Sequence, residues 1–185
     1  VMNQEKIIAA GFGGQGIMSL GRLIAYTGMQ QGKEVSWLPS YGPEMRGGTA
    51  NCNVIISDTP IGSPIITGDA TTVIAMNYPS MVKFVDQLVG DGLLLYNSSL
   101  IEEQPNRDDI RVIPVPANQL AQEAGSLKVA NMVALGAYLA ATEIFKLEDV
   151  VGALKKVFGP SKEKFIPMNE EALKKGMEVV DSVKV

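Results

Sequence analysis

Two residue types that carry much of protein chemistry are missing or nearly missing. The 185-residue chain has no histidine and one cysteine, Cys52. A single cysteine excludes a disulfide within the chain and cannot supply the four thiolates of an iron–sulfur cluster, and the lack of histidine removes the commonest metal ligand and general base. We therefore expect no metal site. Catalysis by this chain alone would have to rely on carboxylate, lysine or tyrosine side chains.

Long apolar runs and blocks of like charge are also absent. The longest nearly apolar stretch, Val129 to Ala141, is broken by Asn131 and is shorter than the roughly 20 residues of a membrane-spanning helix. The first residues lack the basic start and apolar run of a secretory signal. A net charge of -4, with basic residues clustered only in pairs, opposes attraction to nucleic acid. We expect a soluble, cytoplasmic protein that contacts neither membranes nor nucleic acid.

Short apolar runs alternate with segments of helical period along the chain. A hydrophobic content of 46% over 185 residues suits one domain spanning residues 1–185. The predicted strands are 6–12, 34–38, 50–57, 72–76, 93–96 and 111–115, and the predicted helices are 17–30, 80–88, 117–124, 129–145, 147–158 and 169–183. Asn169 is expected to cap the last helix. The alternation predicts an α/β, Rossmann-like fold with a largely parallel sheet, helices on both faces and a helical C-terminal third.

A glycine cluster joins the first predicted strand to the first predicted helix. Gly11, Gly13 and Gly16 have the G-x-G-x-x-G spacing, which places backbone N–H groups and a helix N-terminus where an anion can bind. We expect these N–H groups to form a concave row facing a ligand or a neighbouring subunit. The alternative stays open that the small residues only allow the helix to pack closely on the sheet and on a partner.

Two better-known uses of such glycines are disfavoured by the surrounding residues. A dinucleotide fold needs an acidic residue at the end of the second strand, but Glu34 lies at the start of that strand and Glu44 lies well past it. A phosphate-binding P-loop needs Lys and Ser or Thr where this chain has Ile17 and Met18. The motif therefore gives little support to dinucleotide binding and none to nucleotide hydrolysis.

The segment from Trp37 to Val54, WLPSYGPEMRGGTANCNV, contains the most unusual loop in the chain. Within six residues it carries an aromatic ring, a carboxylate and a guanidinium, on Tyr41, Glu44 and Arg46, among glycines and prolines. Loops with this content are more often functional than structural. The competing interpretation is a surface loop with a Glu44–Arg46 ion pair worth at most about 1 kcal/mol.

The chain resembles a known family at this segment and at three others. GFGGQGIMSLGRLIA, SYGPEMRGGTANCNVIISDTPIGSPI, NMVALGAYLA and the run from Phe165 that includes Asn169 to Gly176 occur in this order. They are similar to the gamma subunits, or equivalent domains, of pyruvate, 2-oxoglutarate and 2-oxoisovalerate ferredoxin oxidoreductases. The form PEMRGGTANC looks most similar to the 2-oxoglutarate type.

The resemblance implies a gamma subunit of an enzyme complex in which other subunits bind thiamine diphosphate, magnesium and iron–sulfur clusters. Such a complex decarboxylates a 2-oxoacid, reduces ferredoxin and transfers the acyl group to coenzyme A, whereas the isolated chain is expected to be inactive and to self-associate. A free-standing nucleotide- or dinucleotide-binding protein and a purely structural subunit are the alternatives. The residues expected to contact coenzyme A or a partner subunit are Gly11, Gly13, Gly14, Gln15, Gly16, Ser40, Tyr41, Glu44, Arg46, Gly47, Gly48 and Asn131.

Overall fold

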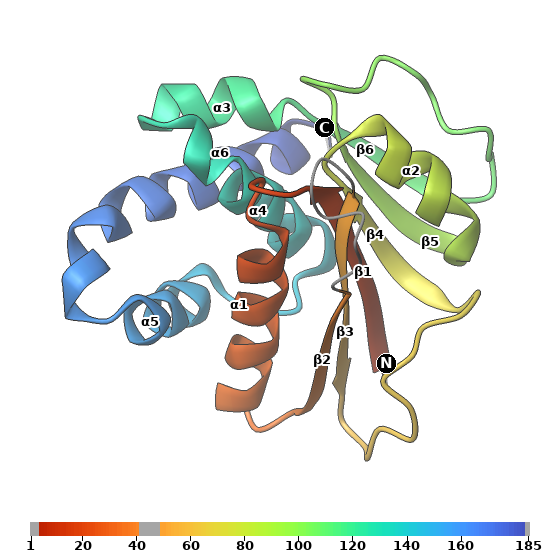
Figure 1. The fold of residues 1–185 in the computed structure, drawn as a ribbon, viewed down its shortest axis with the longest axis horizontal. Coiled ribbons are helices and arrows are strands. Elements are labelled where there is room, and N and C mark those ends of the chain that lie inside the picture. The colour runs from red at the N-terminus through yellow and green to blue at the C-terminus, as the bar shows by residue number, and fades with distance from the viewer. Residues whose placement is uncertain (1–3, 41–48, 184–185) are drawn as a thin grey trace.

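A six-stranded sheet forms the centre of the molecule (Figure 1). The computed structural model describes residues 4–40 and 49–183. The strands lie in the order β2-β3-β1-β4-β5-β6. Their bounds are β1 Gln4–Phe12, β2 Glu34–Ser40, β3 Thr49–Ser57, β4 Ala70–Ala75, β5 Leu88–Asn97 and β6 Arg111–Val115.

The sheet is largely parallel, as predicted. Strands β1, β4, β5 and β6 pair in parallel, while β3 runs antiparallel to both of its neighbours, β1 and β2. The first part of strand β3 alternates, because Cys52 and Val54 are fully buried whereas Asn51 and Asn53 are partly exposed, but residues 54–57 are all buried. Since β3 is antiparallel to both neighbours, β2 and β1 point the same way and end at the same edge of the sheet.

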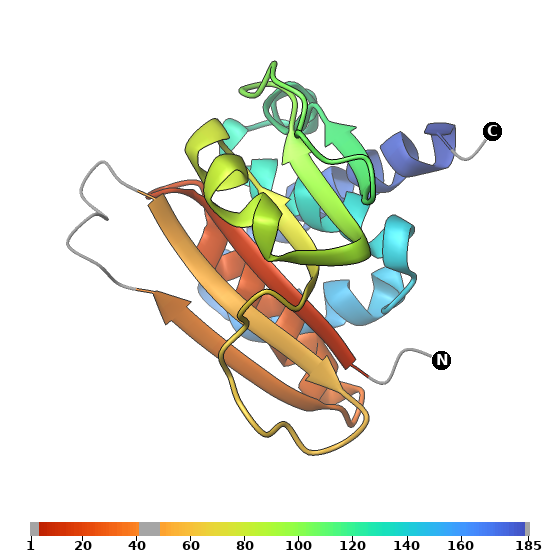
Figure 2. The same cartoon turned by 90° about the vertical axis from the view of Figure 1, so that its right-hand side faces the viewer.

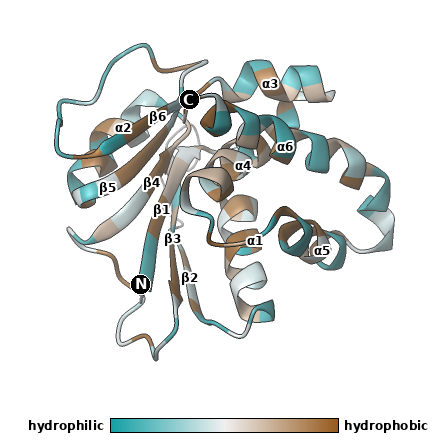
Figure 3. Ribbon diagram, turned by 180° about the vertical axis from the view of Figure 1, so that it is seen from behind, coloured by the Kyte–Doolittle hydropathy of each residue, from teal (hydrophilic) through white to brown (hydrophobic). Residues whose placement is uncertain are grey.

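Helices cover both faces of the sheet, which confirms the α/β class, but they do so unequally. One face carries several helices and the larger core, and the other carries α2 and the loop 58–69 (Figures 1 and 2). Their bounds are α1 Ile17–Gln30, α2 Tyr78–Phe84, α3 Ala117–Ala124, α4 Ala130–Thr142, α5 Leu147–Phe158 and α6 Ile166–Val183, with 3-10 turns at Val85–Gln87, Leu127–Val129 and Pro160–Phe165. Figure 3 shows the hydrophobic colour concentrated on the central strands, with hydrophilic outer turns on α3 and α6.

Helices α4 and α6 approach each other more closely than side chains would allow. A Cβ atom added at Gly136 of α4 would lie 2.0 Å from the Leu173 carbonyl oxygen, and one added at Gly176 of α6 would lie 1.9 Å from the Val133 carbonyl oxygen. Glycine at both positions lets the two backbones touch. Helix α4 is consequently buried around almost its whole circumference, and its N-terminal turn is held at a fixed place beside the sheet.

The expected cap of the last helix was placed wrongly. Helix α6 begins at Ile166 and follows directly from the 3-10 turn, so Asn169 lies inside the helix. Its side-chain Nδ2 donates to the Phe165 carbonyl oxygen at 2.7 Å. Asn169 is therefore buried and bonds backward along the helix, and it does not cap a free N-terminus.

In the described part of the chain, no helix is long and apolar enough to cross a bilayer.

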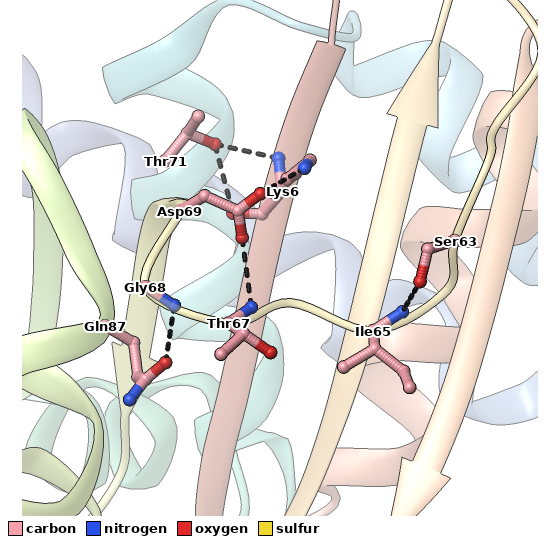
Figure 4. A network of polar contacts seen from close by, with 8 residues as sticks. All are labelled: Lys6, Ser63, Ile65, Thr67, Gly68, Asp69, Thr71 and Gln87. Carbon is pink, nitrogen blue, oxygen red and sulfur yellow. Dashed lines mark hydrogen bonds and ion pairs between the residues drawn. The ribbon is translucent and has the colours of Figure 1, made fainter.

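The loop 58–69 crosses the second face of the sheet and is tied down at its C-terminal end (Figure 4). Lys6 of β1 forms an ion pair with Asp69, and the Asp69 carboxylate also accepts from the Thr67 N–H at 3.0 Å. The Gly68 N–H donates to the Gln87 side chain at 2.8 Å. These contacts hold Ile66 in the smaller core, where it is 6% exposed.

A carboxyl group is buried in the larger core, far from the glycine loop. Glu5, at the start of β1, accepts hydrogen bonds from the Thr72 hydroxyl at 2.6 Å and from the Tyr138 hydroxyl at 3.3 Å. Burial raises the pKa of Glu5 above its ordinary value, and the hydroxyl donors offset only part of that effect. The folded chain therefore holds this proton more tightly than the unfolded chain does.

The sign of the resulting pH dependence follows from linkage. A carboxyl whose pKa is raised in the folded state contributes stability that is fully present below the unfolded pKa, about 4.5, and is lost as pH rises through the folded pKa. Gln at position 5 keeps an acceptor for Thr72 and never ionises. We expect Glu5→Gln to gain stability relative to the parent as pH rises from 4.5 to 8, measured as the free energy of unfolding in urea. A difference that is constant across this range would contradict the expectation.

Candidate functional site

The glycine loop lies at a switch point of the sheet. Strand β1 leads into α1 on the face of the larger core, whereas the neighbouring strand β4 leads into α2 on the opposite face. In open α/β sheets a crevice forms at the carboxyl ends of two such strands and is the usual place for a ligand. Ser40, at the end of β2, lies at the same edge because the pairing aligns Ser40 with Asn51 and Asn51 with Ala10.

The loop from Phe12 to Gly16 is a tight turn with an exposed tip. The Gln15 N–H donates to the Phe12 carbonyl oxygen at 3.2 Å, and Gly14 and Gly16 have φ angles of 91° and 74°, in the left-handed region that favours glycine. Gly13 and Gly14 are exposed. The first turn of α1 has neither a side-chain cap nor an acidic residue, so the positive end of the helix dipole is not neutralised locally.

The Gln15 side chain fills the space between the two strand ends. Its Oε1 accepts from the Phe12 N–H at 2.6 Å, and its Nε2 donates to the Met76 carbonyl oxygen, just past β4, at 3.3 Å. Gly11 makes room for this carboxamide, since a Cβ at Gly11 would lie 2.6 Å from Gln15 Oε1 and 2.9 Å from Met76 Cβ. The expected concave row of N–H groups is thus partly closed by the chain's own side chain.

Asn131, from the start of α4, holds the other end of the loop. Its Nδ2 donates to the Gly16 carbonyl oxygen at 3.1 Å, the same oxygen that accepts from the Leu20 N–H at 3.0 Å. A Cβ at Gly16 would lie 2.4 Å from Asn131 Nδ2. Asn131 is 7% exposed, so the structure brings this predicted residue to the loop but directs its amide at the chain's own backbone.

Cys52 lies beneath the start of α1 and is chemically quiet. Its thiol is 3.7 Å from the Ile17 carbonyl oxygen, and a Cβ added at Gly21 would lie 2.4 Å from its sulfur. Burial raises the pKa of the Cys52 thiol to about 12, which leaves it protonated and neither nucleophilic nor metal-binding near neutral pH. Among the described residues, no group of three or more His, Cys, Asp or Glu side chains is placed to hold a metal ion.

An asparagine at the same edge was missed by the sequence analysis. Asn97, the last residue of β5, donates from Nδ2 to the Met76 carbonyl oxygen at 3.3 Å and to Asn118 at 3.0 Å, and its Oδ1 accepts from the Ala117 N–H at 3.2 Å. The Met76 carbonyl oxygen is therefore shared by Gln15 and Asn97. In the sequence, the available signal for Asn97 was a polar residue at the end of an apolar strand.

Five predicted contact residues, Tyr41, Glu44, Arg46, Gly47 and Gly48, lie outside the described residues.

Comparison with known proteins shows the family to which the chain belongs. The family model described as pyruvate ferredoxin/flavodoxin oxidoreductase matches residues 6–179. The chain belongs to this family. It is 38% identical over 177 residues to the ketoisovalerate oxidoreductase subunit VorA of Methanothermobacter thermautotrophicus, a match that covers 95% of this chain and 36% of that protein. The chain thus spans about a third of the length of this relative.

Two solved structures define the type of subunit more narrowly. The gamma subunit of a keto/oxoacid ferredoxin oxidoreductase from Geobacter sulfurreducens has a TM-score of 0.83 and 29% identity, with 96% of this chain and 99% of that chain covered. The 2-oxoglutarate:ferredoxin oxidoreductase of Magnetococcus marinus, with 2-oxoglutarate, coenzyme A and succinyl-CoA bound, has a TM-score of 0.87 and 26% identity, with 98% of this chain and 32% of that chain covered. The fold is therefore that of a gamma subunit, which can stand alone or form part of a longer chain.

The two left-handed glycines differ in their surroundings, and this difference can be measured. Gly14→Ala should lose about 1 to 2 kcal/mol of unfolding free energy from backbone strain alone, because nothing lies within 4 Å of its Cβ position. Gly16→Ala should lose about 2 to 5 kcal/mol, since overpacking against Asn131 adds to the strain. Urea unfolding of both variants, and of Gly16→Ala combined with Asn131→Ala, would separate the terms. Equal losses for the two single variants would refute the contact.

Proposed function

We propose that the chain is the gamma subunit of a thiamine-diphosphate-dependent 2-oxoacid:ferredoxin oxidoreductase that converts a 2-oxoacid to an acyl-CoA. The observation that carries the proposal is the match of nearly the whole chain, residues 6–179, to the family, together with the fold shared with a free-standing gamma subunit. The partners are the other subunits of the complex, and ferredoxin is reached through them. A single domain spanning 1–185, located in the cytoplasm, is part of the proposal.

The residues of this chain do not fit the redox cofactors of such an enzyme. An iron–sulfur cluster needs four thiolates, and the one thiol here, Cys52, is buried and protonated. The iron–sulfur clusters are therefore assigned to partner subunits, and the resemblance to the family implies the same for thiamine diphosphate and magnesium. The contribution of this chain lies in the surface that it presents at the carboxyl edge of the sheet.

Coenzyme A is the ligand that the exposed loop suits best. Gly13 and Gly14 leave the backbone open to close approach by a ligand. The positive end of the α1 helix dipole lies beside them, and no acidic residue in the first turn of α1 neutralises it. Phosphate groups commonly bind to such helix N-termini, and one structural relative was solved with coenzyme A bound. In this role the loop would bind and orient the coenzyme, while bond-making groups belong to the partner subunits.

A second candidate function, a purely structural gamma subunit, is favoured by the inward contacts of the loop. Gln15 and Asn131, both expected to touch a ligand or a partner, direct their amides at the chain's own backbone. A loop held in this way could serve only to present a rigid surface to the neighbouring subunit. The two functions are distinguished by two measurements on variants of the loop. A coenzyme-binding role changes the Michaelis constant for coenzyme A, whereas a structural role changes the dissociation constant between subunits.

The activity itself is tested by reconstitution. The complex containing this chain should reduce ferredoxin with a 2-oxoacid and coenzyme A, with 2-oxoglutarate preferred over pyruvate and 2-oxoisovalerate on the basis of PEMRGGTANC. The isolated chain, supplied with the same cofactors, should reduce neither ferredoxin nor a viologen. A preference for another 2-oxoacid would correct the substrate alone. Activity of the isolated chain, or inactivity of the complex towards the whole panel, would refute the proposal.

A further test concerns Arg46, and it rests on the sequence. A guanidinium that binds a phosphate or a carboxylate at two points loses that geometry in Arg46→Lys, which should forfeit much of a charged hydrogen bond of about 1.5 to 3 kcal/mol. We expect the Michaelis constant for coenzyme A to rise roughly tenfold to a hundredfold if the ligand is the coenzyme, or the subunit dissociation constant to rise as much if it is a partner carboxylate.

The matched control for this test is Arg22→Lys. Arg22 lies exposed on α1, so this exchange should change neither constant. If Arg46→Lys and Arg46→Ala both behave like the control, Arg46 is an ordinary solvated residue.

A further inference from the structure

Gln15 occupies an unusual position for a residue in an exposed loop. Its backbone belongs to the turn between β1 and α1, but its carboxamide reaches back to the ends of two strands and makes one hydrogen bond to each. The hydrogen-bond ladder between the parallel strands β1 and β4 ends where Ala10 lies opposite Ala75. Both hydrogen bonds of Gln15 go to backbone groups beyond that point. Gln15 gives both groups a partner within the chain, the Phe12 N–H at an exposed position and the Met76 carbonyl oxygen at a partly buried one.

The surrounding residues are shaped to accept this carboxamide. Gly11 has no side chain in the space that Gln15 Oε1 occupies, and any Cβ there would also collide with Ile17 and Met76. The Met76 carbonyl oxygen that accepts from Gln15 is held from the other side by the buried Asn97 amide. Gln15 is therefore one member of a connected set of hydrogen bonds that spans the ends of β1, β4 and β5.

We propose that Gln15 is the positioning residue of the glycine loop: its carboxamide fixes Phe12 and Met76 relative to each other and so holds Gly13 and Gly14 outward in the conformation that receives the ligand. The inference rests on the proposed binding of coenzyme A at this loop. In this role Gln15 acts through the backbone of the loop, because both hydrogen bonds of its amide go to the main chain. Asn131 secures the opposite end of the loop through the Gly16 carbonyl oxygen.

The first test uses the chain alone and does not depend on any ligand. Gln15→Met keeps the length of the side chain but removes both hydrogen bonds, whereas Gln15→Glu keeps the acceptor for the Phe12 N–H. Amide hydrogen exchange followed by NMR should show a protected Phe12 N–H in the parent, loss of about tenfold or more of that protection in Gln15→Met, and retention in Gln15→Glu. The matched control is Gln30→Met, at the exposed far end of α1.

The second test uses the reconstituted complex and separates positioning from stability. In Gln15→Met the Michaelis constant for coenzyme A should rise about threefold to tenfold while kcat stays close to that of Gln30→Met, with both variants assayed well below their midpoints of thermal unfolding. If Gln15→Met does not fold, Gln15→Glu carries the kinetic test, because loss of the donor to Met76 should raise the same constant.

The outcomes distinguish this inference from the function on which it rests. A Phe12 N–H that is unprotected in the parent, or equally protected in Gln15→Met, overturns the positioning role whatever the kinetics show. Loss of protection together with unchanged affinity for coenzyme A leaves Gln15 as the residue that holds the loop and overturns the assignment of coenzyme A to it. Loss of protection with weakened subunit affinity and an unchanged Michaelis constant assigns the loop to the partner subunit and likewise overturns the coenzyme role.

Discussion

The arrangement of the whole carboxyl edge depends on how the backbone groups beyond the last paired residues of the sheet find hydrogen bonds. Strands β1 and β4 end where the chain departs to opposite faces, so neither can pair further with the other. Gln15 and Asn97 fill this gap by converging on the Met76 carbonyl oxygen. The close fit around Gly11 follows from this requirement, because a Cβ there would lie 2.6 Å from the Gln15 oxygen.

The chemistry available to the chain is correspondingly narrow. Among the described residues, three buried titratable groups, Glu5, Cys52 and Tyr138, have pKa values raised by desolvation, which favours their uncharged forms. In the proposed function, the chain contributes shape, backbone dipoles and surface, and proton and electron transfer are assigned to other subunits. This division agrees with a family in which the same fold occurs both as a separate subunit and as part of a longer chain.

Local signals predicted much of the fold from the sequence. Helices 17–30, 117–124 and 147–158 and strand 111–115 have the predicted bounds because apolar periodicity and flanking Gly or Pro agree there. The antiparallel direction of β3 was not predictable, since strand period carries no information on direction. The cap at Asn169 failed because a 3-10 turn supplied the helix start. The glycine loop lies between β1 and α1, as predicted, but the inward bonds of Gln15 and Asn131 depend on tertiary contacts that spacing does not encode.

The bond between Asn131 and Gly16 joins residues 115 positions apart. During synthesis from the N-terminus, β1, the glycine loop and α1 leave the ribosome long before α4 exists, and α4 in turn needs Gly176 of α6 to reach its packed position. The glycine loop is thus completed only by a segment 115 positions further along the chain. A chain interrupted before α4 would therefore carry a glycine loop without its contact to Asn131.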